Sequence, residues 1–275
     1  MVLKQIKEEI ENNHFDFKKK YGQNFIIDEN IINKIINSSD IDENTLVIEV
    51  GPGAGSLTEK LVEKAGFVLC YEIDETLKPI LENTLNDAKN AKVIFEDFLK
   101  ADVKKTLKEF KYEKVYVVSN LPYYITTPII MKLIDDQINP QKIIIMVQKE
   151  VGNRFKALPN TKDYSSLSIF LNYYFDVSKI MDVSRNVFLP KPNVDSIVIE
   201  MKEKKCKYNV KNEEIFFKIV RDSFKQKRKT IKNNLKEYDL DKIEEVLKKY
   251  GFSLDSRAEQ IPTEVFIEIV NMLDK

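Results

Sequence analysis

The sequence predicts an α/β protein with a doubly wound, mostly parallel sheet of seven strands, followed by a small all-α domain. In the first part of the chain, short apolar runs alternate with segments of helical periodicity. This alternation is typical of a parallel sheet with helical crossovers. After residue 201 only helical periodicity remains. We therefore expect a sheet domain at residues 1–201 and a helical domain at residues 202–275.

The expected strands are apolar runs bounded by turn residues. Five of them alternate with helical segments, at residues 46–50, 67–71, 92–95, 114–119 and 142–147. The helical segments cover residues 56–64, 77–86 and 128–135. Two later runs, 168–175 and 194–201, have no long helix between them, which is typical of an antiparallel pair added at a sheet edge.

The second domain combines helical segments with an excess of positive charge. Helical periodicity covers residues 215–235, 240–250 and 263–273, and Gly251 is a typical C-cap of the second segment. The whole chain has zero net charge, yet residues 202–232 contain 12 Lys or Arg against 4 Asp or Glu. Such an asymmetry is typical of a protein that binds a polyanion.

The composition excludes several kinds of protein and of site. No run of about 18 apolar residues is present, so no membrane span is expected. The charged N-terminus lacks the apolar core of a signal peptide, and we expect a cytoplasmic protein. Cys70 and Cys206 are far apart and His14 is the single histidine, so neither a metal site nor histidine-based catalysis is expected.

A glycine-rich loop follows the first expected strand. Gly51, Gly53 and Gly55 are three of only seven glycines in the chain. Glycines there allow a sharp turn and a close approach of the backbone to a ligand, so we expect this loop to line a cofactor site. Glu72 ends the second strand, 17 residues after Gly55. That spacing is close to the position where a carboxylate accepts hydrogen bonds from ribose hydroxyls in dinucleotide-binding folds.

The loop favours S-adenosyl-L-methionine over a dinucleotide. Its spacing lacks the G-x-G-x-x-G signature, and Pro52 is unusual in a pyrophosphate cradle, which disfavours an NAD-dependent dehydrogenase. S-adenosyl-L-methionine carries no phosphate and needs no such cradle. At the end of the third strand, Asp97 is placed to accept a hydrogen bond from the adenine amino group. Phe98 or Ile73 is expected to cover the adenine ring.

A polar and aromatic tetrapeptide, Asn120 to Tyr123, follows the strand expected at residues 114–119. It therefore lies at the sheet edge where open α/β sheets bind ligands. Asn120 offers a side-chain carbonyl, Pro122 stiffens the backbone carbonyls beside it, and Tyr123 offers a flat ring. These groups suit a grip on the amino group of a planar base. A strand-ending turn with a core tyrosine is the alternative interpretation.

Six motifs occur in order along nearly the whole chain. They are KYGQNF at 20–25, EVGPGAG at 49–55, NLPYYITTP at 120–128, VFLPKPNVDS at 187–196, KRKT at 227–230 and RAEQ at 257–260. Together they resemble the ribosomal RNA adenine N6,N6-dimethyltransferases of the KsgA type, over about residues 18–273.

The resemblance implies a Rossmann-like class I methyltransferase that uses S-adenosyl-L-methionine. Its expected reaction is dimethylation of the N6 amino groups of two adjacent adenosines in the 3′-terminal hairpin of 16S small-subunit rRNA, as part of small-subunit biogenesis. The expected partner is this rRNA within an immature or free 30S-type subunit. The resemblance also implies a monomer without a metal or membrane partner.

The resemblance assigns roles to individual residues. Asn24 and Ile26 match residues of an N-terminal arm that close over the cofactor, although the family usually has Leu where this chain has Ile26. Phe188 matches an aromatic residue that sandwiches the target base against Tyr123, and core packing beside the Pro190 loop is the alternative interpretation. A main-chain carbonyl near Leu121 or Pro122 would share the target amine with Asn120. Gly51, Glu72, Asp97 and Asn120 match the remaining cofactor contacts, and Arg221, Lys225, Lys227, Arg228, Lys229 and Lys232 would hold the RNA backbone.

Two other functions are compatible with parts of the same pattern. Resistance-type methylases share the chemistry but act on one adenine of large-subunit RNA. They tend to have Ile where this chain has Leu121, and they usually lack a segment like RAEQ at 257–260, so the small-subunit interpretation is favoured. A non-catalytic ribosome-assembly factor or transcription-factor relative with the same fold is the alternative from a different class.

Overall fold

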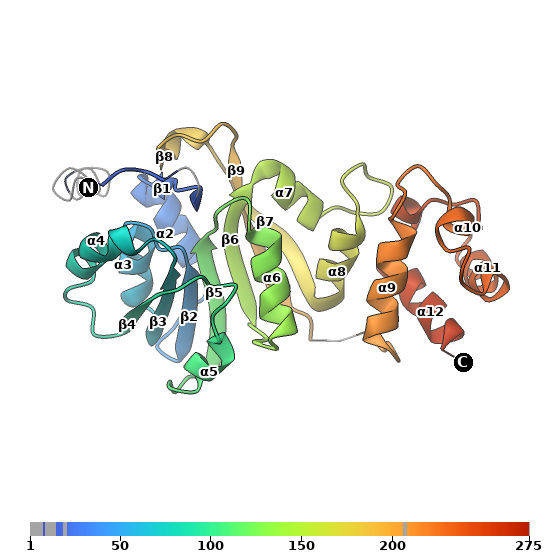
Figure 1. Ribbon diagram of the computed structural model, residues 1–275, viewed down its shortest axis with the longest axis horizontal. Coiled ribbons are helices and arrows are strands. Elements are labelled where there is room, and N and C mark those ends of the chain that lie inside the picture. Colours follow the sequence, from blue (N-terminus) through green and yellow to red (C-terminus); the bar gives the residue numbers. More distant parts are fainter. Residues whose placement is uncertain (1–7, 9–14, 19–20, 206–207, 275) are drawn as a thin grey trace. The chain divides into compact units, whose positions relative to one another are not determined.

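The computed structural model describes residues 8, 15–18, 21–205 and 208–274 (Figure 1). His14, Lys20 and Cys206 lie outside these described residues. The chain forms two compact units, one of residues 1–152 with 178–203 and the other of residues 153–177 with 204–275. The sequence places a single boundary after residue 201, whereas residues 153–177 belong with the helical unit.

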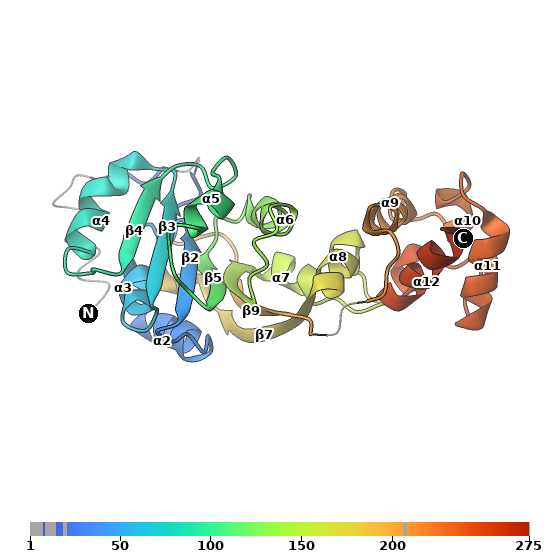
Figure 2. The ribbon, with the colours of Figure 1, turned by 90° about the horizontal axis from the view of Figure 1, so that it is seen from below.

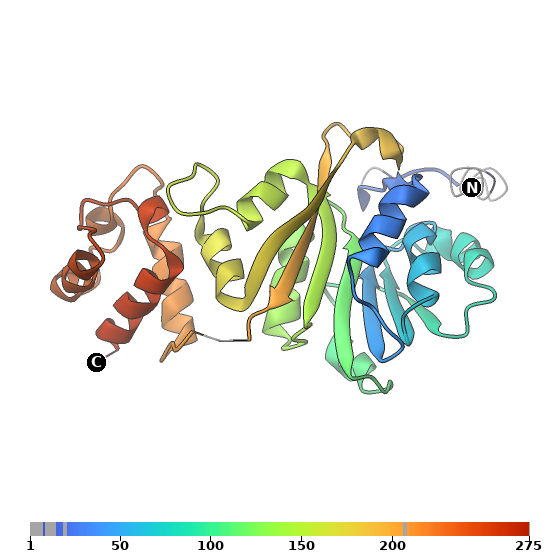
Figure 3. The same cartoon turned by 180° about the vertical axis from the view of Figure 1, so that it is seen from behind.

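A seven-stranded sheet in the order β4-β3-β2-β5-β6-β9-β7 forms the centre of the first unit and confirms the expected fold. The pairs from β4 to β6 are parallel, and β9 runs antiparallel to β6. Figure 3 shows β7 and β9 as neighbours at one edge of the sheet. The strands are β2 (Thr45–Val50), β3 (Phe67–Glu72), β4 (Ala91–Phe95), β5 (Lys114–Asn120), β6 (Lys142–Gln148), β7 (Phe175–Val183) and β9 (Ser196–Glu203).

Helices cover both faces of this sheet. Figure 2 shows α2 and α3 on one face and α5 and α6 on the other. Buried side chains of α2, α3 and α4 share one core with alternate residues of the central strands, such as Val47 and Val68. The helices are α2 (Glu29–Asn37), α3 (Ser56–Val62), α4 (Lys78–Thr84), α5 (Val103–Leu107) and α6 (Thr126–Asp135), with 3₁₀ turns at Glu75–Leu77 and Arg185–Val187.

A short separate sheet ties the N-terminal arm to a later loop of the same unit. Strand β1 (Phe25–Ile26) pairs antiparallel with β8 (Phe188–Leu189), and Ile26 lies opposite Phe188. Helix α2 follows, capped by Asp28, whose carboxylate accepts a hydrogen bond from the Asn30 amide. This sheet holds the arm in place beside the carboxyl ends of the main strands.

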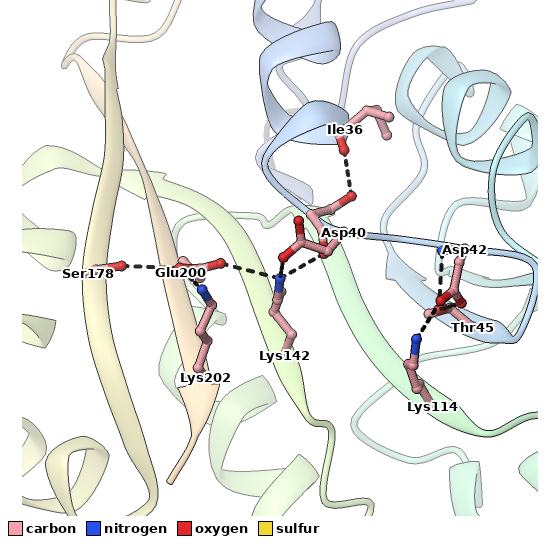
Figure 4. Close-up of polar contacts among 10 residues, drawn as sticks. Ile36, Asp40, Asp42, Thr45, Lys114, Lys142, Ser178, Glu200 and Lys202 are labelled. Atoms are coloured by element: carbon pink, nitrogen blue, oxygen red, sulfur yellow. Dashed lines mark hydrogen bonds and ion pairs between the residues drawn. The ribbon is translucent and has the colours of Figure 1, made fainter. Parts of the chain in front are cut away.

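A buried lysine links helix α2 to the sheet at the edge where β6 begins (Figure 4). Lys142 is 4% exposed. Its ammonium group donates to the Ser39 carbonyl at 2.9 Å and to the Asp40 carboxylate at 2.6 Å, and it lies 3.5 Å from the Glu200 carboxylate on β9. Partners of this kind are required for a charge that has been removed from water. Because the cluster lies where β6 begins, it is a structural feature separate from the opposite edge, where ligands bind.

The second unit is helical and has its own core. Aromatic and aliphatic side chains of all its long helices, including Ile169, Phe216, Val246 and Phe266, form one buried cluster. The helices are α8 (Ser166–Tyr174), α9 (Glu213–Ser223), α10 (Ile231–Asn234), α11 (Leu240–Lys249) and α12 (Thr263–Leu273), with a 3₁₀ turn at Ala258–Gln260, and α7 (Lys149–Phe155) crosses from one unit into the other.

The expectation of a strand at residues 168–175 is wrong, because Ser166–Tyr174 form helix α8 and strand β7 begins at Phe175. Ser165 starts the helix with a capping box, in which its backbone amide donates to the Ser168 hydroxyl at 3.1 Å. Helix α8 is buried on nearly all sides, as the buried side chains of Ile169 and Leu171 show, and its sequence is therefore almost continuously apolar. A short continuous apolar run has no periodicity that separates a buried helix from a buried strand.

The helix expected at residues 215–235 is interrupted. Helix α9 ends at Ser223 and α10 begins at Ile231, so Lys225 to Lys229 lie in the connection between them. The Asn234 side chain donates to the Ser223 carbonyl at 2.7 Å and thereby caps the end of α9. Periodicity alone did not reveal this cap, because its two partners are 11 residues apart.

Candidate active site

A cavity of about 220 Å³ lies at the carboxyl ends of strands β2, β3, β4 and β5. Five segments of the first unit line it: the arm at 21–26, the loop after β2, the end of β3, the loop after β4 and the loop after β5. This is the edge where doubly wound sheets bind their ligands, because the loops there converge from several strands.

The structure brings nearly all the residues predicted to bind the cofactor and the target base together around this cavity. Its lining contains Asn24, Ile26, Gly51, Gly53, Glu72, Ile73, Asp97, Phe98, Asn120, Leu121, Pro122 and Tyr123. Phe188 is not among the lining residues. It is 3% exposed and belongs to the core beneath the arm, where β8 pairs with β1.

The glycine loop forms a tight floor for the cavity. Gly53 has a φ of +59°, in the left-handed region that favours glycine. A Cβ atom at this position would lie 2.7 Å from the Phe25 ring of the arm, closer than side-chain carbons approach. Gly51, with a φ of +72°, is fixed by a 2.8 Å hydrogen bond from its amide to the Tyr71 carbonyl. A residue with a side chain at Gly53 would therefore push the arm away from the loop.

Glu72 is held between the glycine loop and the turn after β3. The Gly53 amide donates to Oε2 at 3.3 Å and the Asp74 amide donates to Oε1 at 2.9 Å. The side chain is 5% exposed. Burial raises the pKa of this carboxyl group to about 7, against the opposing effect of the two backbone donors. Each oxygen of the Glu72 carboxylate accepts from one backbone amide and still has a free lone pair. The carboxylate can therefore accept two further hydrogen bonds from a pair of neighbouring hydroxyls.

A second carboxyl group, Glu49, lies below the loop. It is 1% exposed, and it accepts a hydrogen bond from the Thr58 hydroxyl at 2.6 Å, with the Cys70 sulfur at 3.8 Å. Burial raises the pKa of Glu49 to about 8, so the group is mostly neutral at pH 7. Its neutral form joins β2 to helix α3 and so supports the loop between them.

Replacing Glu49 by glutamine is expected to stabilise the protein by an amount that grows with pH. The ordinary pKa of the group is 4.5, and burial raises it to about 8 in the folded state. The wild-type protein therefore loses stability as pH rises through this window, by up to about 1.4 kcal/mol per pH unit, whereas the glutamine variant does not. Urea unfolding at about pH 5, 6.5 and 8 measures the difference, with the exposed Glu113→Gln as control. A difference that is independent of pH would contradict the assignment.

The N-terminal arm is fastened to the cavity at two places. The Lys18 ammonium group donates to Asp74 Oδ1 at 2.6 Å, and the Gln23 side-chain amide donates to Asp74 Oδ2 at 2.7 Å. Further along, the Asn120 side-chain amide donates to the Asn24 carbonyl at 2.9 Å. Asp74 follows Glu72 by two residues, so the arm is anchored beside the expected ribose contact.

The tetrapeptide Asn120 to Tyr123, which begins with the last residue of β5, is fixed by polar contacts on two sides. Ser119, directly before it, donates to the Val50 carbonyl at 2.5 Å. The Tyr123 hydroxyl lies 2.7 Å from the Ser196 hydroxyl at the start of β9. Because the Asn120 nitrogen is used by the arm, its Oδ1 is the amide atom that can accept from a ligand in the cavity.

The loop after β4 presents a carboxylate to the cavity but little aromatic surface. Asp97 Oδ1 accepts from the Leu99 amide at 3.0 Å, which fixes the side chain at the loop. Phe98 is 3% exposed and packs edge-on against Tyr71, with 5.3 Å between the ring centroids. Phe98 therefore lines the cavity with only a small part of its ring.

The six cationic residues expected to bind RNA are all exposed in the second unit. Lys225, Lys227, Arg228 and Lys229 lie in the connection from α9 to α10. Lys227 also donates to the Lys162 carbonyl at 2.8 Å, which attaches this connection to the loop before α8. Arg221 lies in α9 and Lys232 in α10, so the set spans two helix ends and the connection between them.

Several lining residues were not expected from the sequence. Tyr21, Gly22, Phe25, Leu99 and Tyr124 all contribute to the cavity. The Asp74 anchor was also missed, although its position two residues after Glu72 was a usable signal. Within the described part of the chain, no three His, Cys, Asp or Glu side chains gather as a metal site would require, and no helix is long and apolar enough to cross a membrane.

Comparison with known proteins identifies a family model that matches nearly the whole chain. The family model described as "Ribosomal RNA adenine dimethylase" matches residues 14–275. A curated relative from Oceanobacillus iheyensis, named "Ribosomal RNA small subunit methyltransferase A", is 44% identical over 266 residues, covering 94% of this chain and 90% of the relative.

Two solved structures share the fold at 24% sequence identity. One is a dimethyladenosine transferase from Plasmodium falciparum, with a TM-score of 0.75 over 91% of this chain and 97% of that one. The other is the 23S rRNA methyltransferase ErmE, with a TM-score of 0.72 over 91% and 100%. The family model and the 44% identical relative cover nearly the whole chain. The chain therefore belongs to the ribosomal RNA adenine dimethylase family.

Proposed function

We propose that this protein dimethylates the N6 amino groups of two adjacent adenosines in the 3′-terminal hairpin of 16S small-subunit rRNA, with S-adenosyl-L-methionine as methyl donor. It acts as a monomer in the cytoplasm, on RNA within an immature or free small subunit. The observation that carries the proposal is the Asn120 amide, fixed by the Asn24 carbonyl so that its oxygen remains as an acceptor in the same cavity as Glu72.

The residues at the cavity fit the proposed cofactor. Glu72 offers two buried carboxyl oxygens to ribose hydroxyls, and the close turn at Gly53 leaves no room for a side chain. Asp97 offers an acceptor for an amino group, and Asn24 and Ile26 complete the lining from the arm. When bound, S-adenosyl-L-methionine supplies a methyl group already activated by the positive sulfonium.

Asn120 and the carbonyls beside it would make the adenine amine reactive. The lone pair of that amine delocalises into the ring, so the free amine is a poor nucleophile. The Pro122 carbonyl already accepts from the Ile125 amide at 3.2 Å, which favours the Leu121 carbonyl as the second acceptor. Hydrogen bonds from the two amino hydrogens to Asn120 Oδ1 and to this carbonyl would favour the pyramidal form that attacks the methyl carbon. Methyl transfer from the bound cofactor would form the new C–N bond as the C–S bond breaks, and the resulting ammonium would lose a proton to water. Positioning of this kind supplies at most about 7–11 kcal/mol.

Aromatic rings would hold the extruded base. Tyr123 lines the cavity and its ring is oriented by the 2.7 Å contact with Ser196. Stacking on such a ring contributes about 1–3 kcal/mol per base and offsets part of the cost of unstacking. Phe188 takes the second stacking position only if the β1–β8 pair opens, because its side chain is 3% exposed.

In vitro methylation of isolated small subunits tests the proposal directly. Subunits from a strain that lacks the modification are incubated with the protein and S-adenosyl-L-methionine, and the product nucleosides are identified by mass spectrometry. The proposal predicts N6,N6-dimethyladenosine at two adjacent positions of the small-subunit hairpin. Modification of the large subunit alone would identify a resistance-type methylase, and absence of calorimetric cofactor binding would favour a non-catalytic assembly factor.

Replacing Lys227, Arg228 and Lys229 together by alanine is expected to weaken RNA binding and flatten its salt dependence. Removing one cation that neutralises a phosphate lowers the slope of log K against log salt by about 0.7–0.9. Filter binding of small-subunit RNA at several salt concentrations measures this slope. The matched control replaces Lys242, Lys248 and Lys249 of α11, of which Lys248 and Lys249 are paired with Glu244 and Glu268. Equal slopes for the two triple variants would place the RNA-binding surface elsewhere.

A further inference from the structure

Two large apolar side chains are exposed at the cavity. Among the described residues, the exposed large hydrophobic side chains are Ile73, Tyr112, Tyr124, Leu158, Val194 and Tyr250. Only Ile73, at 43% exposure, and Tyr124, at 57%, line the cavity. Exposed apolar surface that is gathered at a concave site is the kind of surface that a bound ligand covers.

Tyr124 lines the cavity beside the N-terminal arm. Its ring is packed against the arm, since a Cβ atom on Gly22 would be 3.4 Å from Tyr124 Cε1. A 3.2 Å hydrogen bond from the Ile125 amide to the Pro122 carbonyl fixes the turn that carries it. Burial, followed by the charges of Asp97, Tyr21 and Glu72, raises the pKa of the Tyr124 hydroxyl. Tyr124, Asp97 and Glu72 all line this one cavity.

The other aromatic rings at the cavity are already committed to other contacts. Phe98 is 3% exposed and lies edge-on to Tyr71. Tyr123 points its hydroxyl to Ser196 on β9. Phe25 lies against the glycine loop beside Gly53. Tyr21 is half-buried, and the Lys18 ammonium lies 5.9 Å from the centre of its ring. Among the described aromatic residues of the lining, Tyr124 is therefore the one whose side chain is largely exposed.

We propose that Tyr124, together with Ile73, covers the adenine ring of S-adenosyl-L-methionine. This inference rests on the proposed function and adds a cofactor-binding residue to it. An aromatic ring stacks on adenine by its face and needs no hydrogen bond, so the hydroxyl is dispensable. Because Tyr124 contacts Gly22, the same ring also joins the cofactor to the arm that closes over it.

Calorimetric titration of three variants tests this assignment. Tyr124→Ala is expected to bind S-adenosyl-L-methionine roughly tenfold more weakly than the wild type, as loss of one stacking partner predicts. Tyr124→Phe should retain wild-type affinity, because it keeps the ring. Tyr112→Ala, which removes an exposed tyrosine remote from the cavity lining, is the matched control and should have no effect. If Tyr124→Ala fails to fold, Ile73→Ala provides the test. A severalfold loss of cofactor affinity in Ile73→Ala would support the proposal that these two side chains cover the adenine ring, and an unchanged affinity would overturn it.

A second ligand locates the contact on the adenosine part of the cofactor. S-adenosylhomocysteine has the same adenosine but no sulfonium charge, so Tyr124→Ala should weaken its binding by the same factor. A loss confined to S-adenosyl-L-methionine would place the ring at the sulfonium and overturn the inference. Unchanged cofactor affinity with a lower kcat/KM for RNA would instead assign the ring to the target base. If the wild-type protein binds neither ligand, the proposed function itself fails.

Discussion

Replacing Asn120 by alanine is expected to lower kcat for methyl transfer by a factor of about 10²–10³, the usual cost of removing one fixed polar group from a reacting centre. The variant loses the proposed acceptor for one amino hydrogen of adenine. It also loses the donor that ties Asn24 of the arm to the tetrapeptide. RNA affinity should change little, because we propose that the exposed cationic residues of the second unit supply most of the free energy of RNA binding. Single-turnover methylation with saturating RNA and cofactor measures kcat for the chemical step.

Two further variants separate the roles of the Asn120 amide. Asn24→Ala keeps the backbone carbonyl that accepts from Asn120, so methyl transfer at saturating cofactor should remain within a few-fold of wild type. Asn37→Ala, at the exposed end of α2, controls for general effects of losing an amide side chain. Full turnover in Asn120→Ala would show that backbone carbonyls alone orient the amine, and the hydrogen-bond role would be refuted.

The sheet was predictable because its signals are local. Strands β2 to β6 are short apolar runs, each bounded by turn residues, and their parallel order follows from the helical segments between them. Helix α8 was not predictable in the same way. Its run from Leu167 to Tyr173 is buried on nearly all sides, so neither a period of two nor one of 3.6 is visible. The capping pair Ser165 and Ser168 was the one local signal of a helix.

The site was predictable where residues follow strand ends, and less so where distant segments meet. Glu72 and Asn120 end strands β3 and β5, and Asp97 comes two residues after β4, so topology alone brings them together at one sheet edge. The contacts of Asp74 with Lys18 and Gln23 join segments about 50 residues apart and leave no trace in periodicity. The burial of Phe188 depends on the β1–β8 pair, whose strands have two residues each. Such short strands carry too few residues for a pattern to be recognised.

Binding of S-adenosyl-L-methionine is expected to strengthen as pH rises from about 6 to 8, because in the proposed binding mode the ionised Glu72 accepts from both ribose hydroxyls. Burial raises the pKa of Glu72 to about 7 in the free protein, so at pH 6 only about a tenth of the molecules carry the carboxylate. Affinity at pH 6 should be roughly tenfold lower than at pH 8, and binding at pH 6 should release close to one proton. Calorimetry in buffers of different ionisation enthalpy measures both quantities.

Glu72→Gln separates this effect from the titration of the cofactor itself. The variant keeps the shape of the side chain but cannot ionise, so its affinity at pH 8 should fall by at least about tenfold, while the additional loss between pH 8 and pH 6 should disappear. Glu96→Gln removes an exposed carboxylate from the same cavity lining and should leave both the affinity and its pH dependence as in the wild type.

If the wild type and Glu72→Gln showed the same pH dependence, the titrating group would belong to the cofactor, and Glu72 would bind ribose without a change of charge. The two backbone donors on Glu72 argue that Glu72 itself is the group that titrates on cofactor binding. The Gly53 and Asp74 amides favour the ionised carboxylate and leave it ready for a ligand that completes its hydrogen bonds.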